Sequence, residues 1–384
     1  MTPFKKIIRF LHLWLGLGAG LVVLVVALTG STMVFQDELE PVLFSKTLKV
    51  DPGPEKLSLD SLLKVAKKEF PKKKINQAKL FYEKNRSLIV TFGKKDEDED
   101  MKVVYIDPYT GRVLGKGDYN HQFFMVVKNL HRYLLAGETG KIITGLSCCI
   151  FIVLLISGLV LWWPANKNAL KQRFRIKWKA SAKRVNWDLH AVTGFYGSFF
   201  LLIITGTGLV WSYQWANNLI FRIADGKGPE KKKKVMNYAE ASGGRIKNVY
   251  ETAVLATDSI YTFPGNTTIT PPASDSTAIT IVKDNISLAG EPPHLAWFDS
   301  KTGRYIGHMP FAQYTTGLKI RKMILPIHTG SIYGWPTKVL ALIVSLFAAS
   351  LPVTGVILWL GKRRRKRQSN LHRNYRIPYH RRCH

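Results

Sequence analysis

Four long apolar runs are the dominant pattern along the chain. None of them contains an Asp, Glu, Lys or Arg residue. A helix of about 20 apolar residues crosses the hydrocarbon core of a bilayer, so each run is long enough to span it. The pattern therefore predicts four transmembrane helices, over residues 11–35, 142–163, 189–211 and 339–360.

The first run follows Lys5, Lys6 and Arg9, as the core of a secretory signal would. However, it is longer than the roughly 7–15 apolar residues of a signal core. No small-residue cleavage site follows it. We therefore expect it to remain in the protein as the first span.

The basic residues gather in short segments between the apolar runs. The net charge is +30, and residues 1–10, 164–188 and 361–384 hold 3, 8 and 10 Lys or Arg against one acid, Asp188. Short basic segments beside membrane spans stay in the cytoplasm, so we expect both termini and the central loop there. Nucleic-acid or anionic-lipid contact is the alternative interpretation of the Lys362–Arg367 run, and we expect no nucleic-acid partner.

Residues 36–141 and 212–338 then face the opposite side, and each segment is long enough for a small domain. In the first segment, Leu59, Leu62, Leu63 and Ala66 have helical spacing. Strand-like runs follow at residues 79–82, 88–92 and 103–106, and the acidic run Asp96–Asp100 predicts a hairpin loop. This order predicts a small α+β domain.

The two halves of the chain share residues at equal spacing. Both outer segments contain a tight turn that ends in Thr-Gly-Arg, at Asp107–Arg112 and Asp299–Arg304. Counted from His131 and from His328, Lys, Gly and Trp recur at +10, +27 and +31. Counted from His12 and from His190, Gly recurs at +4 and Thr-Gly at +17 and +18. Such fixed offsets indicate an internal duplication: span, outer domain, span, repeated once.

The duplication sorts four histidines into two pairs. His12 and His190 begin the spans that run outward, so both lie near the cytoplasmic face. His131 and His328 precede the spans that run inward, so both lie toward the outer face, where glycines and a proline predict a bend: Gly137, Gly140, Gly330, Gly334 and Pro336. An ionisable residue in or beside a bilayer is a functional candidate, and a hydrogen bond to a neighbouring helix is the alternative role for each histidine.

Histidine pairs between helices suit haem iron. Neutral imidazole is a strong iron ligand, and a helical bundle can hold a flat macrocycle between two helices. Two axial histidines leave no open iron position, so such a haem carries electrons. The four histidines are therefore the candidate cofactor-binding residues and iron ligands, and no catalytic residue is predicted. Cys148, Cys149 and Cys383 lack the C-x-x-C and C-x-x-C-H spacings of zinc clusters and covalent haem.

Other residues near these positions have more than one interpretation. Gly16, Gly18, Gly20, Gly194 and Gly197 allow either close approach of a macrocycle or tight helix packing. Six tryptophans are expected as interface anchors rather than electron relays: Trp14, Trp162, Trp163, Trp187, Trp211 and Trp359. The remaining histidines are assigned no cofactor: His121, His294 and His308 in the outer segments, and His372, His380 and His384 in the basic tail.

Several motifs resemble the PepSY-associated transmembrane helix family. They are His12-Leu-Trp-Leu-Gly16, Leu130-His131-Arg132, Leu161-Trp-Trp-Pro164, Asp188-Leu-His190 and His328-Thr-Gly330, and Tyr105–Leu114 looks like the end of a PepSY domain. The resemblance covers nearly the whole chain. It implies a bacterial inner-membrane protein similar to ferrisiderophore reductases with two b-type haems. It also implies His12 with His190 and His131 with His328 as haem ligands, and outer domains in the periplasm.

These observations predict a membrane α-helical protein. Its expected architecture is a four-transmembrane-helix bundle from an internal duplication, with two periplasmic PepSY-like α+β domains at residues 36–141 and 212–338. The expected function is di-haem transmembrane electron transfer to a periplasmic acceptor, such as a ferric siderophore or other ferric chelate. A separate electron donor is expected, because no G-x-G-x-x-G follows a strand and the chain stops after a short basic tail.

Two other functions fit the same sequence features. In one, the PepSY-like domains bind a peptidase or another partner, and the spans are anchors. In the other, the histidines relay metal ions or protons in a transporter. The lipid bilayer is a partner in all three cases, and the chelate, the donor and the oligomeric state stay open.

Overall fold

The computed structural model describes residues 2–93, 101–164, 170, 172–229, 247–272 and 277–374. The predicted loop at Asp96–Asp100, and His380, Cys383 and His384, lie outside these residues. The chain forms two compact units. The first unit comprises Met1–Ser31, Leu130–Ser212 and Leu340–His384, and the second comprises Thr32–Asn129 and Tyr213–Val339.

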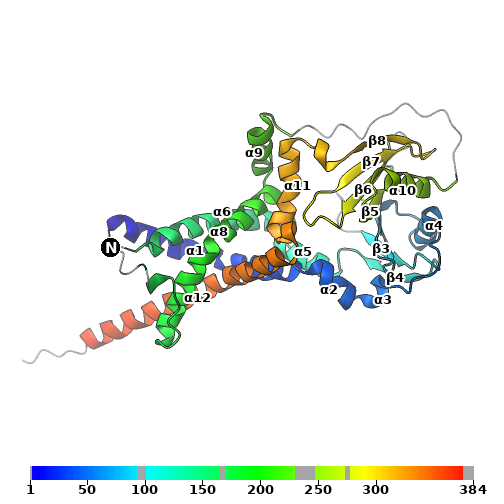
Figure 1. The fold of residues 1–384 in the computed structure, drawn as a ribbon. Helices are drawn as coiled ribbons and strands as arrows, with labels where there is room; N and C mark the ends of the chain where they lie inside the picture. The colour runs from blue at the N-terminus through cyan, green and yellow to red at the C-terminus, as the bar shows by residue number, and fades with distance from the viewer. Residues whose placement is uncertain are drawn as a thin grey trace, which may run out of the picture. The chain divides into compact units, whose positions relative to one another are not determined.

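Four long helices make up most of the first unit (Figure 1). They are α1 (Pro3–Met33), α6 (Gly137–Trp162), α8 (Ala182–Ser212) and α12 (Trp335–Asn374). Each has the length and apolar composition needed to cross a membrane, so the prediction of four spans is confirmed. Helices α1 and α8 begin well before their apolar runs, because the Lys and Arg residues there are themselves good helix formers.

A compact apolar core joins these four helices. Small residues let the helix backbones approach: a Cβ atom at Gly20 would lie 3.3 Å from Cβ of Pro352, which joins α1 to α12. Many large apolar side chains of the same helices are exposed, as expected where lipid surrounds them. The core residues are Ala19, Val23, Phe151, Leu155, Leu201, Val344 and Ala348.

The chain bends immediately before α6 and before α12, as the glycines predicted. Helix α5 (Phe123–Tyr133) ends at a turn in which Leu134 and Leu135 have φ of 49° and 56°, and Gly137 has φ of 54°. Helix α11 (Thr316–Thr329) ends at Gly330 with φ of 76°, and the short helix η3 (Ser331–Tyr333) leads to α12. The long helices α6 and α12 are thus each preceded by a separate short helix.

The second unit is built on one eight-stranded sheet, in the order β4-β3-β2-β1-β5-β6-β7-β8. We expected two separate domains, but strands β1 and β5 pair, with Ala78 opposite Ile269 and Leu80 opposite Thr267. This pairing covers an edge that each four-stranded half would otherwise expose. The strands are β1 (Ile75–Leu80), β2 (Leu88–Phe92), β3 (Lys102–Ile106), β4 (Val113–Asp118), β5 (Gly265–Thr270), β6 (Ile279–Asn285), β7 (His294–Phe298) and β8 (Tyr305–Met309).

Two helices, α4 (Leu59–Glu69) and α10 (Val249–Ile260), cap each other at their N-termini. The Asp60 carboxylate accepts hydrogen bonds from the backbone N–H groups of Tyr250 and Glu251, at 3.3 and 2.9 Å. The Glu251 carboxylate accepts one from the N–H of Leu59 at 2.6 Å. Both helices contribute to one apolar core with both halves of the sheet, so the two halves fold as a single unit.

Helix α9 (Gln214–Asp225) follows the third span and packs against α11 within the second unit (Figure 1). The Asp225 carboxylate accepts hydrogen bonds from the Thr315 hydroxyl and the Gly317 N–H, both at 2.8 Å. Arg321 donates to the Asn217 side chain at 2.7 Å. A Cβ atom at Gly317 would lie 2.5 Å from the Asp225 carboxylate, so this close contact requires glycine. Two shorter helices, α2 (Gln36–Leu43) and α3 (Ser45–Leu48), follow the first span.

Candidate functional site

His12 of α1 and His190 of α8 face each other inside the first unit. Their ring centroids are 6.3 Å apart, and the ring planes are nearly perpendicular at 88°. Both side chains are partly buried among the four helices. The structure thus brings together the first of the two histidine pairs expected from the repeat.

The Ser157 hydroxyl fixes the protonation of the His12 ring. Nδ1 of His12 lies 2.9 Å from Oγ of Ser157, and that hydroxyl donates its own hydrogen to the Leu154 carbonyl at 3.1 Å. A hydroxyl has one hydrogen, so when it goes to the Leu154 carbonyl, Oγ accepts from His12 and Nδ1 carries the proton. Nε2 is then the ring nitrogen with a free lone pair, which is the form that binds a metal.

His190 has the equivalent arrangement with Thr354 of α12. Nδ1 of His190 lies 2.9 Å from Oγ1 of Thr354, whose hydroxyl hydrogen goes to the Ser350 or Leu351 carbonyl at 2.9 or 3.0 Å. Ser157 and Thr354 both lie 26 residues after a repeat histidine, at His131 and His328. The two rings are therefore held in the same tautomer by matching residues of the two halves.

A glycine lies under each of these two rings. A Cβ atom at Gly158 would be 3.4 Å from Cε1 of His12, and one at Gly355 would be 3.5 Å from Cε1 of His190. The glycines for which two interpretations were open mostly contact side chains instead. Cβ atoms at Gly16, Gly194 and Gly197 would meet Leu154, Leu351 and Phe347 of other helices, which favours helix packing there, whereas Gly18 has open space around it.

His131 has a similar hydrogen bond at the opposite end of α1. Its Nδ1 lies 2.9 Å from the Val26 carbonyl and 3.1 Å from the Thr29 hydroxyl. A carbonyl only accepts, so Nδ1 again carries the proton and Nε2 is free of it. A Cβ atom at Gly30 would lie 3.1 Å from Cε1 of this ring. His328 lies in the last turn of α11, in the second unit, at the place that His131 has in α5.

Trp162 of α6 was expected as an interface anchor. It is buried, stacks on Phe195 of α8 at 3.8 Å between ring centroids, and its indole N–H has no hydrogen-bond partner among the described residues. Trp162 follows Gly158 by one helical turn, and Phe195 follows His190 by five residues. Trp14 and Trp163 are more than half exposed, as expected for anchors.

Asp188, the acid in the basic loop, has a structural role that the sequence did not indicate. Its carboxylate is buried two residues before His190. It accepts hydrogen bonds from Arg184 at 3.0 Å and from the backbone N–H of Lys177 at 3.1 Å. These bonds fix the start of α8, and with it the position of His190.

The chemistry of this donor set fits a haem. Within the described residues, no three His, Cys, Asp or Glu side chains gather around one point to hold a bare metal ion. The pair offers two imidazole nitrogens, and a macrocycle would supply the remaining ligands. With a bond of about 2 Å from each nitrogen to one iron, two facing rings would have centroids roughly 6 Å apart, which agrees with the observed 6.3 Å.

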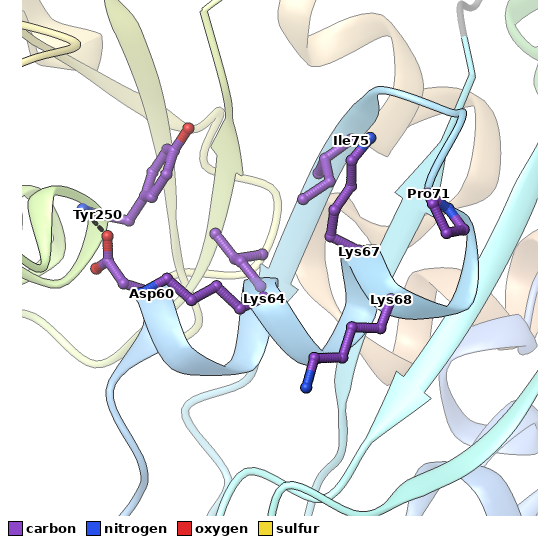
Figure 2. A pocket seen from close by; sticks show the side chains of 8 residues that line it. Asp60, Lys64, Lys67, Lys68, Pro71, Ile75 and Tyr250 are labelled. Atoms are coloured by element: carbon purple, nitrogen blue, oxygen red, sulfur yellow. Dashed lines mark hydrogen bonds between the residues drawn. The ribbon is translucent and has the colours of Figure 1, made fainter.

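A pocket of about 580 Å³ lies in the second unit beside α4. Figure 2 shows Lys64, Lys67 and Lys68 along it, with the ring of Tyr250 at one end. Asp60 at the same end is already used to cap α10. The pocket holds no histidine, and we assign no ligand to it.

The four spans and the histidine pair between them define a multi-pass membrane protein with a candidate cofactor site inside its helical bundle. The chain belongs to the PepSY-associated TM region family, whose model matches residues 9–362. No curated protein matches the chain. The family match confirms the resemblance seen in the sequence motifs.

Proposed function

We propose that this protein carries electrons across the membrane through two b-type haems. The observation that carries the proposal is the His12–His190 pair: two rings at 6.3 Å, each with Nδ1 bonded to a hydroxyl and Nε2 left as a ligand. When bound by two axial histidines, haem iron has no open position and exchanges single electrons.

The residues around the first pair have distinct parts in this proposal. Ser157 and Thr354 orient the rings and raise the basicity of Nε2, as hydrogen-bond partners of metal-bound histidines do. Gly158 and Gly355 leave space beside the rings. The surrounding apolar core excludes water from the site.

His131 and His328 are proposed as the second pair because of the sequence repeat. Both end a short helix before an inward-running span, and both have Lys, Gly and Trp at the same offsets. The hydrogen bond from His131 to the Val26 carbonyl gives that ring the tautomer of the first pair. We take the chain to be an internal duplication, since helix, four strands and helix occur in the same order in both halves.

The acceptor that we propose is a ferric chelate, such as a ferric siderophore, in the bacterial periplasm. Reduction to Fe(II) weakens binding by hard oxygen ligands, so one electron suffices to release the iron. The 21 basic residues of the three short segments support cytoplasmic termini, and with them a periplasmic position for the sheet unit. A separate cytoplasmic or membrane protein or quinol would supply the electron.

An optical spectrum and a haem count on detergent-purified protein test this proposal. We expect two haems per chain and a reduced-minus-oxidised spectrum of the bis-histidine type. Replacing His12 or His190 with Ala should remove one haem, and replacing His131 or His328 should remove the other. The exposed His121 is a matched control, and H121A should keep both.

A colourless protein would refute the proposal and favour a partner-binding module or a transporter. Binding of a protein partner to the second unit would support the partner-binding module. Flux of metal ions or protons in proteoliposomes would support the transporter. Loss of both haems from every single replacement would keep the proposal that the protein binds haem but contradict the pairing.

A further inference from the structure

Two helices that directly follow membrane spans expose apolar stripes. In α9, Trp215, Leu219 and Ile223 recur at helical spacing and are 57%, 48% and 77% exposed. In α2, the same holds for Leu39, Val42 and Leu43, at 42%, 66% and 58%. Large apolar side chains grouped on one helical face indicate an interaction surface, whereas single exposed ones do not.

The opposite face of α9 is already used inside the second unit. Phe221 is buried, and the Asp225 and Asn217 bonds fix α9 to α11. The stripe therefore lies on the side of α9 that α11 leaves open. Another phase or molecule can pack on this side of α9.

The positions of both helices along the chain indicate what packs on the exposed stripes. Helix α8 ends at Ser212 and α9 begins at Gln214, and α1 ends at Met33 and α2 begins at Gln36. Both begin 24 residues after the histidine of their span, at His190 and His12. At no more than about 3.6 Å per residue, such connections leave each helix start within about 11 Å of the span's end.

We infer that α2 and α9 lie in the bilayer interface, in the leaflet at which α1 and α8 end, with their stripes among the lipid tails. The composition fits lipid: a Trp begins the α9 stripe, Arg222 is exposed beside it, and Lys46 is exposed just beyond α2. Long basic side chains there reach the phosphates while their stems stay in apolar surroundings.

This anchoring has a consequence for α11. Asp225 and Asn217 of α9 bind the first turns of α11, and α11 ends with His328. Insertion of α9 therefore sets the depth of the helix that carries His328. The inference itself does not depend on a bound haem.

Site-directed spin labelling of the full chain in lipid nanodiscs tests the inference. In a background with Cys148, Cys149 and Cys383 replaced by Ala, single cysteines are introduced by L219C, I223C and V42C. Leu255 of α10 is the matched control, because it is 59% exposed in the same unit but far along the chain from any span. Collisions with oxygen, which partitions into lipid, and with a water-soluble nickel chelate are measured at each label.

We expect oxygen to dominate at the labels on α2 and α9 and the nickel chelate to dominate at L255C. Nickel accessibility at L219C and I223C equal to that of L255C would place the stripe in water and overturn the inference. Low accessibility to both reagents would mean burial against a second copy or a partner protein, which also contradicts it. A variant that elutes as aggregate is replaced by the neighbouring stripe position, L39C or L43C on α2 and W215C on α9.

Discussion

The Ser157 hydroxyl accepts a hydrogen bond from Nδ1 of His12 across 2.9 Å, and so links α6 to α1. Thr354 forms the same link between α12 and α8 through His190. These hydroxyls act as positioning groups, because each fixes both the rotation and the tautomer of a ring that is proposed to bind iron. Partners of this kind are typically worth about 10- to 100-fold in metal affinity.

Removing either hydroxyl should therefore weaken haem retention without unfolding the bundle. For S157A and T354V we expect haem to dissociate faster, by about 10-fold or more. We also expect the midpoint potential of one haem only to shift. Haem transfer to apomyoglobin and redox titration measure the two effects. S198A and T193V are controls, since Ser198 and Thr193 bond only to carbonyls of their own helix. Unchanged dissociation and potential would assign the hydroxyls to helix packing alone.

The mutual capping of α4 and α10 should contribute to the stability of the sheet unit. D60A removes the acceptor of two N–H groups at the start of α10, which typically costs about 1–2 kcal/mol. We expect a lower midpoint in thermal unfolding and faster proteolysis of this unit, with haem content unchanged. D51A, at an exposed aspartate, is the control and should have little effect. E251Q combined with D60A should cost less than the two single changes added, because both act on the same pair of helix ends.

Alkaline pH should destabilise the same unit through buried tyrosines. Burial raises the pKa of Tyr314 from its usual 10 to about 12, and its hydroxyl donates to the Pro293 carbonyl at 2.8 Å. The unfolded chain loses this proton first, so the stability contributed by Tyr314 is complete below pH 10 and falls between pH 10 and 12. For one residue this loss is at most about 2–3 kcal/mol.

Replacement of Tyr314 by Phe separates the two effects. Y314F should be less stable by about 1 kcal/mol at pH 8, because the hydrogen bond to Pro293 is lost. It should also show a shallower loss of stability between pH 10 and 12 than the natural chain. Denaturant unfolding at pH 8, 10 and 11 measures both, with Y333F at an exposed tyrosine as the control. Parallel curves for Y314F and the natural chain would mean that Tyr314 does not titrate in this range.

Local patterns predicted the spans, and long-range pairing explains what they missed. An apolar run without charges is a local signal, so the four apolar runs were sufficient to predict the four long helices. Strand β4 was missed because Gly115 and Gly117 interrupt it, and glycine weakens the strand pattern. The joined sheet depends on pairing between Ala78 and Ile269, nearly 200 residues apart, which no local pattern contains.

The candidate site divides in the same way. The repeat identified the histidines and contained Ser157 and Thr354 at equal offsets, but their role needs the facing of α1 with α6 and of α8 with α12. Trp162 was expected as an interface anchor because tryptophans near span ends usually are. Its burial follows from stacking on Phe195, a contact between two different spans.

The indole N–H of Trp162, which has no partner among the residues that the structure describes, leads to a prediction that depends on the proposed haem. A buried donor without an acceptor costs about 1–3 kcal/mol, so W162F should leave haem-free protein equally stable or more stable. Haem carries carboxylate groups that accept hydrogen bonds, and a bound carboxylate within reach of this N–H would reverse the sign. In the loaded protein, W162F should therefore speed haem loss from the His12–His190 site.

F195L is the control, because it removes the stacked ring but keeps the N–H. Thermal unfolding of haem-depleted protein and haem transfer from loaded protein give the two readouts. Equal haem transfer from W162F and the natural chain would show that the bound group does not use this donor, even with both haems present.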